Sequence, residues 1–593
     1  MKSTKKQLYT TVLGLGLLNV LSSCNDSFMD RFPETSITEK VFFQNPGDLE
    51  SYTNGMYGYL GASYWDAVSD NMLYKESSST YELLSGTRSP ETWGTWSWGD
   101  IRKVNFMLAR TGNVKGDKAE INHYIGLARM FRAKLYYDKV KSYSDVPWYS
   151  TDLQTTDTEE LYKTQDPRKL VVDSIMADLD FAVKNMKAGT SKTRIFKNAA
   201  LALQARIALN EGTFRKYHPE LELNDADRFL NIAVSAASQL MDGTYSLSEV
   251  KENDLEAYES LFCSLNLTSN PEMILVSDYD KALGRMHNAQ QIGDVYHGLS
   301  RDLMEDYLVI DGNETKPFHT VPGYETKTYL EIFENRDPRL RQTFMWPGYQ
   351  KANESSPHRT NMDAGGYAQI KFDPRTYDQI SWNKSYTDLP IFRYAEILLI
   401  YAEAKAELGT LTQEDASINL IRKRAGVPEA SLADWLANID PVQDTRYPNV
   451  SSTQKGAVLE IRRERRIELA CEGFRYNDLM RWGCGKLMEK APEGAYIPGM
   501  GMYDITGDGQ PDVAFVRNKA EADNLLQEER EKVTVYTLEG HTIELTEGDK
   551  GYIRLKAQVN KFKFEEPKYY YSPIAIDDIT LNNNLVQNKW WKN

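Results

Sequence analysis

Apolar residues recur every three to four positions in several stretches of the chain, which is the period of an amphipathic α-helix. In the longest stretch, residues 119–143, Ile121, Ile125 and Ala128 fall on one stripe with aromatic side chains beside it. The same periodicity predicts further helices over residues 173–186, 198–212, 225–241, 392–409, 413–426 and 455–473. We expect the helix over 198–212 to end at Gly212, because glycine is a common helix stop. The pattern predicts a mainly α-helical protein.

The predicted helices come in adjacent pairs with small residues, mostly alanine, on their facing sides. Small side chains let helix axes approach closely, which is typical of helical-hairpin units of the tetratricopeptide kind. The chain has no strict repeat period, so an irregular helical domain fits the pattern equally well.

Two irregular regions interrupt the helical pattern. Residues 61–99 are rich in Ser, Tyr, Trp and Gly, and residues 243–391 are rich in Asn, Asp, Gly, Pro, Tyr and Thr, with short β-like runs. Insertions of this length are uncommon unless they serve function. The sequence therefore predicts a helical scaffold that carries polar, aromatic loops.

The first residues have the pattern of a secretory signal. Three lysines precede an apolar stretch, residues 12–21, that is too short to span a membrane as a helix. The four residues Leu21-Ser22-Ser23-Cys24 resemble a bacterial lipobox, which implies cleavage before Cys24 and lipidation of its sulfur. An ordinary signal peptide with a chance cysteine is the alternative.

The composition excludes some function classes. The 593-residue chain has a net charge of −15, which makes it a poor candidate for binding nucleic acid. Only three cysteines follow Cys24 and the seven histidines are scattered, so neither a disulfide framework nor a zinc site is indicated. Tyrosine is abundant, with 36 residues against 20 phenylalanines, and suits surfaces that are both wet and apolar.

The stretch ETWGTWSWGD, residues 91–100, concentrates three of the 11 tryptophans in a glycine-spaced segment. Flat aromatic rings match the C–H face of a sugar ring, while amide, carboxylate and guanidinium groups match its hydroxyls. Clustered tryptophans in a polar loop indicate a binding surface. The candidate sugar-binding residues here are Trp93, Trp96, Trp98, Asp100, Arg102 and Asn105. We favour Trp93 and Trp96, since Trp98 lies beside a predicted helix start, and we expect Asn105 to be partly structural.

Five segments carry a resemblance to a known family. The segment ERRIELACEGFRYNDLMRW, residues 464–482, is the most specific of them. The chain resembles the SusD/RagB-like outer-membrane lipoproteins of Bacteroidetes in family order over residues 129–148, 205–218, 392–428, 460–482 and 569–591. The tail departs slightly, with Ser572-Pro573-Ile574-Ala575 where the family usually has Pro-Ile-Pro, and Lys589 where Pro-Gly is usual.

The resemblance implies a SusD-like scaffold of four tetratricopeptide-like helix pairs with a loop-rich, short-strand capping subdomain. It also implies a lipid-anchored protein of the outer membrane, exposed at the cell surface, that forms a lid on a SusC-like TonB-dependent transporter. Such proteins bind oligosaccharide or polysaccharide without catalysis. Family sites combine the early loop with the irregular middle region, which points to Tyr279, Tyr296 and His297.

The predicted organisation divides the chain into five parts. These are a lipoprotein signal peptide (1–23), a lipid-anchored tether (24–45), an N-terminal helical scaffold with the aromatic loop (46–242), a loop-rich subdomain (243–391), and C-terminal helical pairs with a capping segment (392–593).

The charged segment 460–475 has a structural interpretation. Glu464, Glu468 and Glu472 repeat at four-residue spacing, which would place three like charges on one helix face. Arg463, Arg465 and Arg475 can offset them through three-residue pairs with Glu460, Glu468 and Glu472. We expect an ion-pair network that packs this helix on its neighbours, rather than an acid–base site.

The stretch YDITGDGQPDVAF, residues 503–515, has the oxygen spacing of a calcium-binding loop. The candidate ligands of a structural Ca²⁺ are Asp504, Thr506, Asp508, the Gln510 carbonyl and Asp512, with Gly509 at the sharp turn. Position 12 holds Phe515 where an EF-hand has a bidentate glutamate, so this is not an EF-hand proper. An Asp/Gly turn without metal is the alternative.

Three functions compete at this point. The first is glycan capture for a transporter, and the second is binding of peptide or other non-glycan cargo on the same scaffold. The third is a surface glycoside hydrolase, which needs two carboxylates about 5–10 Å apart. The sequence holds 85 acidic residues and shows no catalytic motif.

Overall fold

The computed structural model describes residues 42–592 apart from 67–68, 75–78, 252–254, 290–296, 353 and 416. The signal segment, the lipobox Cys24 and the candidate Tyr296 lie outside the described residues. Within the described part of the chain, no helix is long and apolar enough to cross a membrane.

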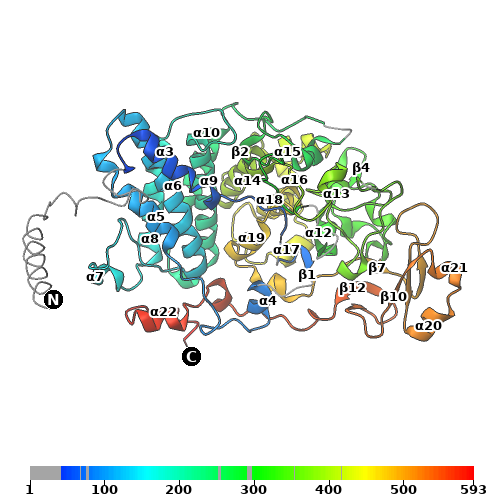
Figure 1. The fold of residues 1–593 in the computed structure, drawn as a ribbon. Coiled ribbons are helices and arrows are strands. Elements are labelled where there is room, and N and C mark those ends of the chain that lie inside the picture. Colours follow the sequence, from blue (N-terminus) through cyan, green and yellow to red (C-terminus); the bar gives the residue numbers. More distant parts are fainter. Residues whose placement is uncertain are drawn as a thin grey trace, which may run out of the picture.

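Helices dominate the structure, as the periodicity predicts. The N-terminal helices pack side by side at one end of the molecule, with α6 against α5 and α8, and α9 against α8 and α10 (Figure 1). The chain then reaches the centre, where α14 packs on α10 and on α18. The principal helices are α5 (Gly99–Leu108), α6 (Lys118–Tyr143), α8 (Arg168–Asn185), α9 (Lys197–Tyr217), α10 (Ala226–Leu240), α14 (Tyr394–Glu407), α15 (Ile418–Ala425), α18 (Lys455–Glu468) and α19 (Arg475–Arg481).

Short helices connect these elements and cover their ends. The last of them, α22, lies beside the N-terminal helices although it is the final helix of the chain (Figure 1). The short helices are α3 (Pro46–Asn54), α4 (Ser79–Leu84), α7 (Thr158–Leu161), α11 (Ala257–Cys263), α12 (Arg301–Asp306), α13 (Arg339–Thr343), α16 (Leu432–Ala437), α17 (Pro441–Arg446), α20 (Lys519–Asn524), α21 (Gln527–Arg530) and α22 (Ile576–Leu581).

The described strands form five small sheets rather than one large one. Two of these have three strands, in the orders β10-β9-β8 and β11-β12-β7, and the others are the pairs β1-β3, β2-β6 and β4-β5. Apart from the parallel pair β9-β10, the strands pair antiparallel. The strands are β1 (Met72–Tyr74), β2 (Met273–Ser277), β3 (His297–Leu299), β4 (Val309–Asp311), β5 (Glu314–Lys316), β6 (Leu389–Arg393), β7 (Tyr496–Ile497), β8 (Gly501–Tyr503), β9 (Val513–Val516), β10 (Thr534–Thr537), β11 (Ile543–Leu545) and β12 (Gly551–Leu555).

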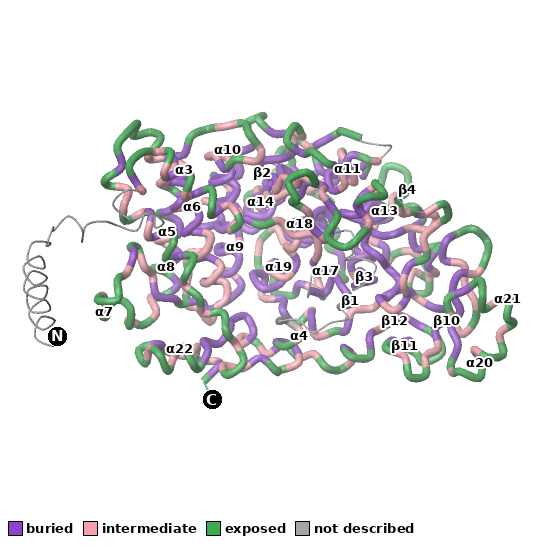
Figure 2. Tube along the Cα trace, viewed as in Figure 1, coloured by how far each residue is buried: buried purple, intermediate pink, exposed green. Residues whose placement is uncertain are grey.

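The described residues form two large hydrophobic cores, one among the long helices and one among the short strands. The first lies among the long helices and includes Leu127, Ala236 and Leu399. The second lies among the short strands and joins residues of the loop-rich middle region, such as Phe344, to residues of the C-terminal capping segment, such as Phe515. In Figure 2 buried trace runs through the long helices and also through much of the loop and strand region, while exposed trace lies mainly at the outer edge of the molecule.

The helix over residues 198–212 does not stop at Gly212, so that prediction is wrong. Helix α9 continues to Tyr217 because Gly212 does not take the left-handed conformation of a glycine that ends a helix. It lies instead where α9 approaches α10 closely. A Cβ atom at Gly212 would lie 3.0 Å from atoms of Leu230. Glycine is retained here for the space it leaves between two helices, at the modest cost in helix propensity that glycine carries.

Buried or partly buried ion pairs join the helices to one another. In each pair an arginine of one helix meets a carboxylate of another through two hydrogen bonds, the geometry in which guanidinium and carboxylate match best. The pairs are Arg132 of α6 with Asp178 of α8, Arg168 of α8 with Glu211 of α9, Arg206 of α9 with Glu396 of α14, and Arg481 of α19 with Glu403 of α14.

Helix α18 lies at the centre of this network, and all but its first residue, Lys455, are buried. The Oε1 atom of Glu468 lies 2.7 Å from Arg393 and also contacts Arg424, while its Oε2 atom lies 3.0 Å from Arg339. Burial alone would raise the pKa of Glu468, but the three guanidinium groups outweigh it and lower that pKa. The charged segment is therefore structural, as the sequence indicates.

The partners within this network differ from those that the spacing suggested. Arg463 does pair with Glu460 at 2.8 Å, but Arg465 pairs with Asp478 and Arg475 with Asp70. The predicted pair of Arg465 with Glu468 is wrong because Glu468 faces arginines of other segments, Arg339, Arg393 and Arg424. The predicted pair of Arg475 with Glu472 is wrong because α18 ends at Glu468, so Glu472 does not continue its face and pairs with Arg393 instead.

We predict that Glu468→Gln lowers the free energy of unfolding by about 3–5 kcal/mol at neutral pH, because it leaves three buried guanidinium groups short of negative charge. Because folding lowers the pKa of Glu468, its stabilisation is complete above its unfolded pKa of about 4.3 and declines below it. Thermal and urea unfolding at pH 7, 5 and 3.5 measures both effects.

Glu528→Gln on the exposed helix α21 is the matched control for this substitution and should leave stability unchanged. Equal melting temperatures for the two variants at pH 7 would contradict the structural role of Glu468.

Candidate functional site

An aromatic groove lies against the first core, where four chain segments meet. It has a volume of about 430 Å³. Its segments are the start of α5 with the tryptophan loop before it, the loop 147–153, the end of α7, and α22 with the residues after it. The groove is lined by Trp96, Trp98, Ile101, Arg102, Asn105, Pro147, Tyr149, Thr151, Leu153, Leu161, Tyr162, Asp578, Leu581, Asn582 and Leu585.

Two of the three clustered tryptophans line this groove. The ring centroids of Trp96 and Trp98 are 5.3 Å apart in an edge-to-face arrangement, and Trp98 meets Tyr149 in the same way at 5.4 Å. Trp96 also packs on Tyr143 at 4.8 Å. Each tryptophan is partly exposed, so the rings are held by their neighbours and still reach the groove.

Trp93 does not line the groove. Its indole Nε1 donates a hydrogen bond to the Tyr143 hydroxyl at 3.1 Å, and the Arg88 guanidinium lies 4.0 Å from its ring centroid. The sequence favoured Trp93 over Trp98 as a sugar-binding residue, but their positions favour the reverse. Trp93 contacts Tyr143 and Arg88, whereas Trp98 lines the groove.

Asn105 is a structural residue at the base of the groove. It is 1% exposed, its Nδ2 donates to the Tyr149 carbonyl at 2.8 Å, and its Oδ1 accepts from Arg132 at 3.0 Å. Arg132 also donates to the Ser150 carbonyl at 2.9 Å. The amide thus joins α5 to the loop 147–153 through Tyr149 and to α6 through Arg132, as the sequence partly anticipated.

The polar residues at the start of α5 differ in their positions. Arg102 lines the groove, and its side chain is 65% exposed with Nε 3.4 Å from Asp152. Asp100 does not line the groove; its carboxylate accepts from the Tyr59 hydroxyl at 3.0 Å and from Lys103 at 2.9 Å. Arg102 is therefore the polar candidate of this helix that can meet a ligand.

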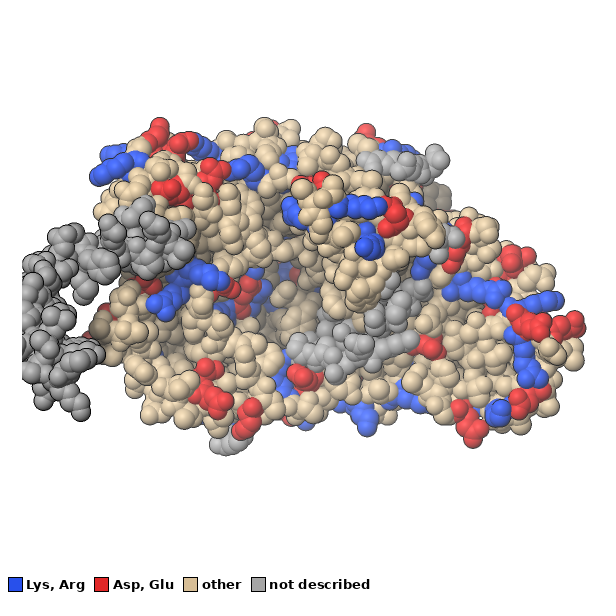
Figure 3. Space-filling view, in the orientation of Figure 1, with Lys and Arg blue, Asp and Glu red and all other residues tan. Residues whose placement is uncertain are grey.

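The charges at the groove are balanced rather than of one sign. Burial lowers the pKa of Lys139, which lies over the Trp98 ring, to about 8 despite the carboxylates of Asp138 and Asp578. Burial also raises the pKa of Asp578, with Lys139 acting in the opposite direction. More widely, the face drawn in Figure 3 carries acidic and basic side chains interspersed.

The middle-region candidates lie elsewhere, against the second core. His297 belongs to β3 and is 2% exposed, while Tyr279 is partly buried with its ring 4.5 Å from that of His287. Neither residue lines the aromatic groove. The structure therefore does not join Tyr279 and His297 with the tryptophan loop in one groove.

Several groove residues carry no signal in the sequence. Tyr149 lies in a loop after α6, Tyr162 is 50% exposed beside α7, and Leu581 is 76% exposed at the end of α22. The C-terminal segment is held to α7 by Asn584, whose side chain donates to the Tyr162 carbonyl at 2.6 Å. These residues meet only through the fold, so no local pattern could have found them.

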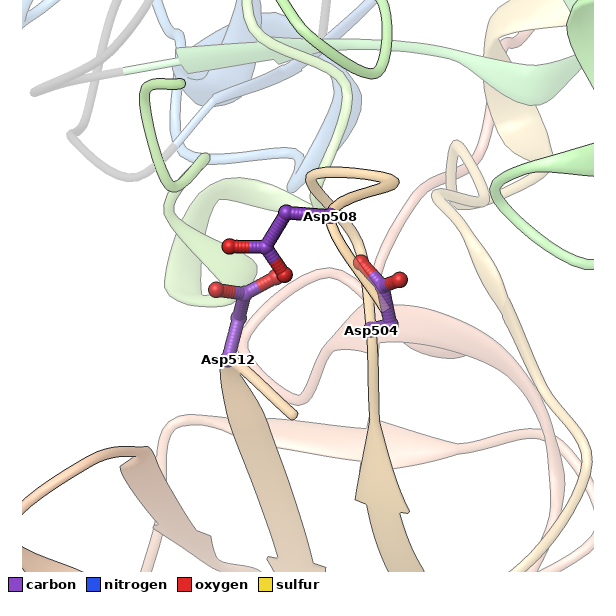
Figure 4. A group of neighbouring side chains, drawn as sticks. All are labelled: Asp504, Asp508 and Asp512. Atoms are coloured by element: carbon purple, nitrogen blue, oxygen red, sulfur yellow. The ribbon is translucent and has the colours of Figure 1, made fainter. Parts of the chain in front are cut away.

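The candidate metal ligands lie at the opposite end of the molecule, in the turn between β8 and β9. One oxygen from each of Asp504, Asp508 and Asp512 lies within 4.8 Å of the others (Figure 4). Thr506 and Gln510 belong to the same turn.

Comparison with known proteins identifies a matching family model and relatives that cover most of this chain. The SusD family model matches residues 276–591. SusD-like protein P38 of Formosa agariphila is 24% identical over 509 residues, covering 80% of this chain and 91% of that protein. SusD-like protein P2 of the same organism is 22% identical over 502 residues, covering 79% and 90%.

Solved structures are similar over nearly their whole length. A SusD-like protein and a SusD-like carbohydrate binding protein, both from Bacteroides fragilis, each match with a TM-score of 0.65 and 19% identity, covering 94% and 92% of this chain and all of theirs. A laminarin binding SusD-like protein matches with a TM-score of 0.53 and 18% identity, covering 92% of this chain and all of that one. With the family model matching more than half of the sequence, the chain belongs to the SusD family.

Proposed function

We propose that this protein binds oligosaccharide or polysaccharide at the aromatic groove, without catalysis, and delivers it to a SusC-like TonB-dependent transporter. The observation that carries the proposal is the pair of partly exposed rings, Trp96 and Trp98, beside the exposed guanidinium of Arg102. Such rings can stack on the C–H face of a sugar, while Arg102 and Asn582 can bond its hydroxyls. The groove volume falls within the range of about 300–1,000 Å³ that is usual for ligand pockets.

The comparisons support a glycan ligand. One similar structure is described as a carbohydrate binding protein and another as laminarin binding. Both are under 20% identical to this chain, so the particular glycan does not transfer with the fold.

The charges of the groove favour a neutral glycan over an acidic one. Among the described lining residues, Arg102 is the one cation, and it already lies 3.4 Å from the Asp152 carboxylate. A site for uronic acids or sulfate esters would need cationic groups left over for the ligand.

The groove also lacks the layout of a glycosidase centre in its described lining. Asp578 is the one carboxylate among those residues, whereas glycoside hydrolysis uses two that flank the scissile bond. We therefore expect binding without product formation.

We predict that Trp96→Ala and Trp98→Ala each weaken glycan binding at least tenfold, equivalent to about 1.4 kcal/mol, because each removes a stacking surface. Isothermal titration against a panel of neutral and acidic glycans that includes laminarin measures the affinity. Melting curves of each variant show whether it is folded, which matters for Trp98 because it packs on Tyr136 and Tyr149.

Trp382→Ala is the matched control, since Trp382 is 51% exposed and does not line the groove. Glycan binding that survives both groove substitutions would refute the proposed site. Binding of peptide with no affinity for any glycan would favour the alternative cargo, and released sugar would establish an enzyme.

We propose Cys24 as the lipid attachment site. We expect the wild-type chain, expressed in a Bacteroidetes host, to incorporate a fatty-acid label and to fractionate with the outer membrane. Cys24→Ser should abolish both, whereas Cys263→Ser, in the folded part of the chain, should not. Membrane retention of the Cys24→Ser protein would contradict the anchor.

We propose a SusC-like transporter as the partner on the basis of the family. Affinity purification of the tagged, lipidated chain from detergent-solubilised outer membranes should recover a TonB-dependent β-barrel, identified by mass spectrometry. Recovery of the chain alone, under conditions that keep known outer-membrane complexes together, would count against this partner.

A further inference from the structure

The turn between β8 and β9 brings an unusual set of oxygen atoms together. Strand β8 ends at Tyr503 and β9 begins at Val513, and these two residues pair directly. Asp504 and Asp512 therefore stand at the two ends of the loop that joins these strands, and Asp508 lies midway between them. Figure 4 shows the three carboxylates converging from the two arms and the tip of this turn.

The three carboxylates are closer than like charges prefer. One oxygen of each lies within 4.8 Å of the others, and Asp512 is only 1% exposed. Repulsion between such charges is strong where burial reduces solvent screening. Arg359 lies 3.0 Å from Asp512 and can balance one of the three charges.

A second observation at the turn is independent of the carboxylates. Thr506 is 4% exposed, and its hydroxyl oxygen has no hydrogen-bond partner within the described part of the chain. Its backbone N–H donates to Asp504 at 3.0 Å and to Asp512 at 2.9 Å, so the residue is held between the two carboxylates. An unsatisfied buried hydroxyl is costly, and a bound cation would use that oxygen.

The backbone near the tip of the loop orients one of the three carboxylates. Gly509 has φ of 80°, a left-handed conformation that favours glycine, and a Cβ atom there would meet nothing within 4 Å. Its N–H donates to the second oxygen of Asp504 at 2.7 Å, which orients that carboxylate. Phe515, at the twelfth position, has a hydrocarbon side chain with no oxygen to offer a cation, and it is buried against Tyr536.

We propose that this turn binds one Ca²⁺ through the carboxylates of Asp504, Asp508 and Asp512 and the hydroxyl of Thr506. Calcium takes six to eight oxygen ligands in a flexible arrangement, so water and a backbone carbonyl such as that of Gln510 complete the shell. Magnesium fits less well, because it demands a small, near-ideal octahedron and retains its water. The ion stabilises the β8–β9 hairpin and, through β9, its parallel neighbour β10.

The test is calcium titration of the purified mature chain after removal of divalent ions. Isothermal titration with CaCl₂ should give one site per chain, with a Kd at or below about 1 mM, the range of extracellular calcium modules. Because a ligand that binds only the folded state stabilises it, Ca²⁺ at a large excess over Kd should raise the melting temperature, and EDTA should reverse the rise.

Asp508→Asn is the most informative variant, because Asp508 is exposed and the side chain can be changed without disturbing the core. It should weaken Ca²⁺ binding at least tenfold and remove the calcium-dependent rise in melting temperature. The metal-free variant should melt no lower than the metal-free wild type, because one of three mutually repelling charges is removed. Asp523→Asn, an exposed aspartate of the nearby helix α20, is the matched control and should bind Ca²⁺ normally.

Three results would overturn the proposal. They are no saturable Ca²⁺ binding up to 5 mM, about five times the upper Kd expected, unchanged binding by Asp508→Asn, and equal affinity for Mg²⁺ alone. Glycan binding is measured separately, so failure of this site and failure of the groove are distinguishable.

Discussion

The rest of the structure depends on buried arginine–carboxylate pairs that join one helix to the next. Burying a guanidinium costs less free energy when a carboxylate matches its charge and accepts its N–H groups, so each pair favours one relative position of its two helices. Arg132 with Asp178, Arg168 with Glu211, and Arg481 with Glu403 act in this way. Hydrophobic burial supplies the driving force for packing, while these pairs restrict it to one register.

One of these ion pairs, Arg132 with Asp178, also positions residues of the candidate binding groove. Arg132, held by Asp178, donates to Asn105 and to the Ser150 carbonyl, and Asn105 in turn holds the Tyr149 carbonyl. The start of α5 and the loop 147–153 are thus fixed to the helical scaffold on the groove side. Because these groups are ordered before any ligand arrives, less conformational entropy is lost on binding.

The sequence predicted what depends on local spacing and missed what depends on distant contact. Helical periodicity located α6, α8, α10 and α14, and the segment 464–482 indicated the family. It placed Trp96 and Trp98 in a polar aromatic loop with Arg102 just after it, and the structure brings these three to one groove. It favoured Trp93 over Trp98, whereas Trp98 lines the groove and Trp93 does not. Their positions depend on Tyr143 and Tyr149, about 50 residues away, which local spacing does not reveal. Nor could it find Tyr162 with Leu581, which meet from opposite ends of the chain.

The central claim is that a sugar binds on the rings of Trp96 and Trp98, and a crystal structure with a bound oligosaccharide tests it most directly. The glycan used should be the tightest ligand found in solution. The account predicts a sugar ring stacked on Trp96 or Trp98 with a hydroxyl hydrogen-bonded to Arg102. An oligosaccharide bound instead against the second core, at Tyr279 for example, with the groove left empty, would contradict it.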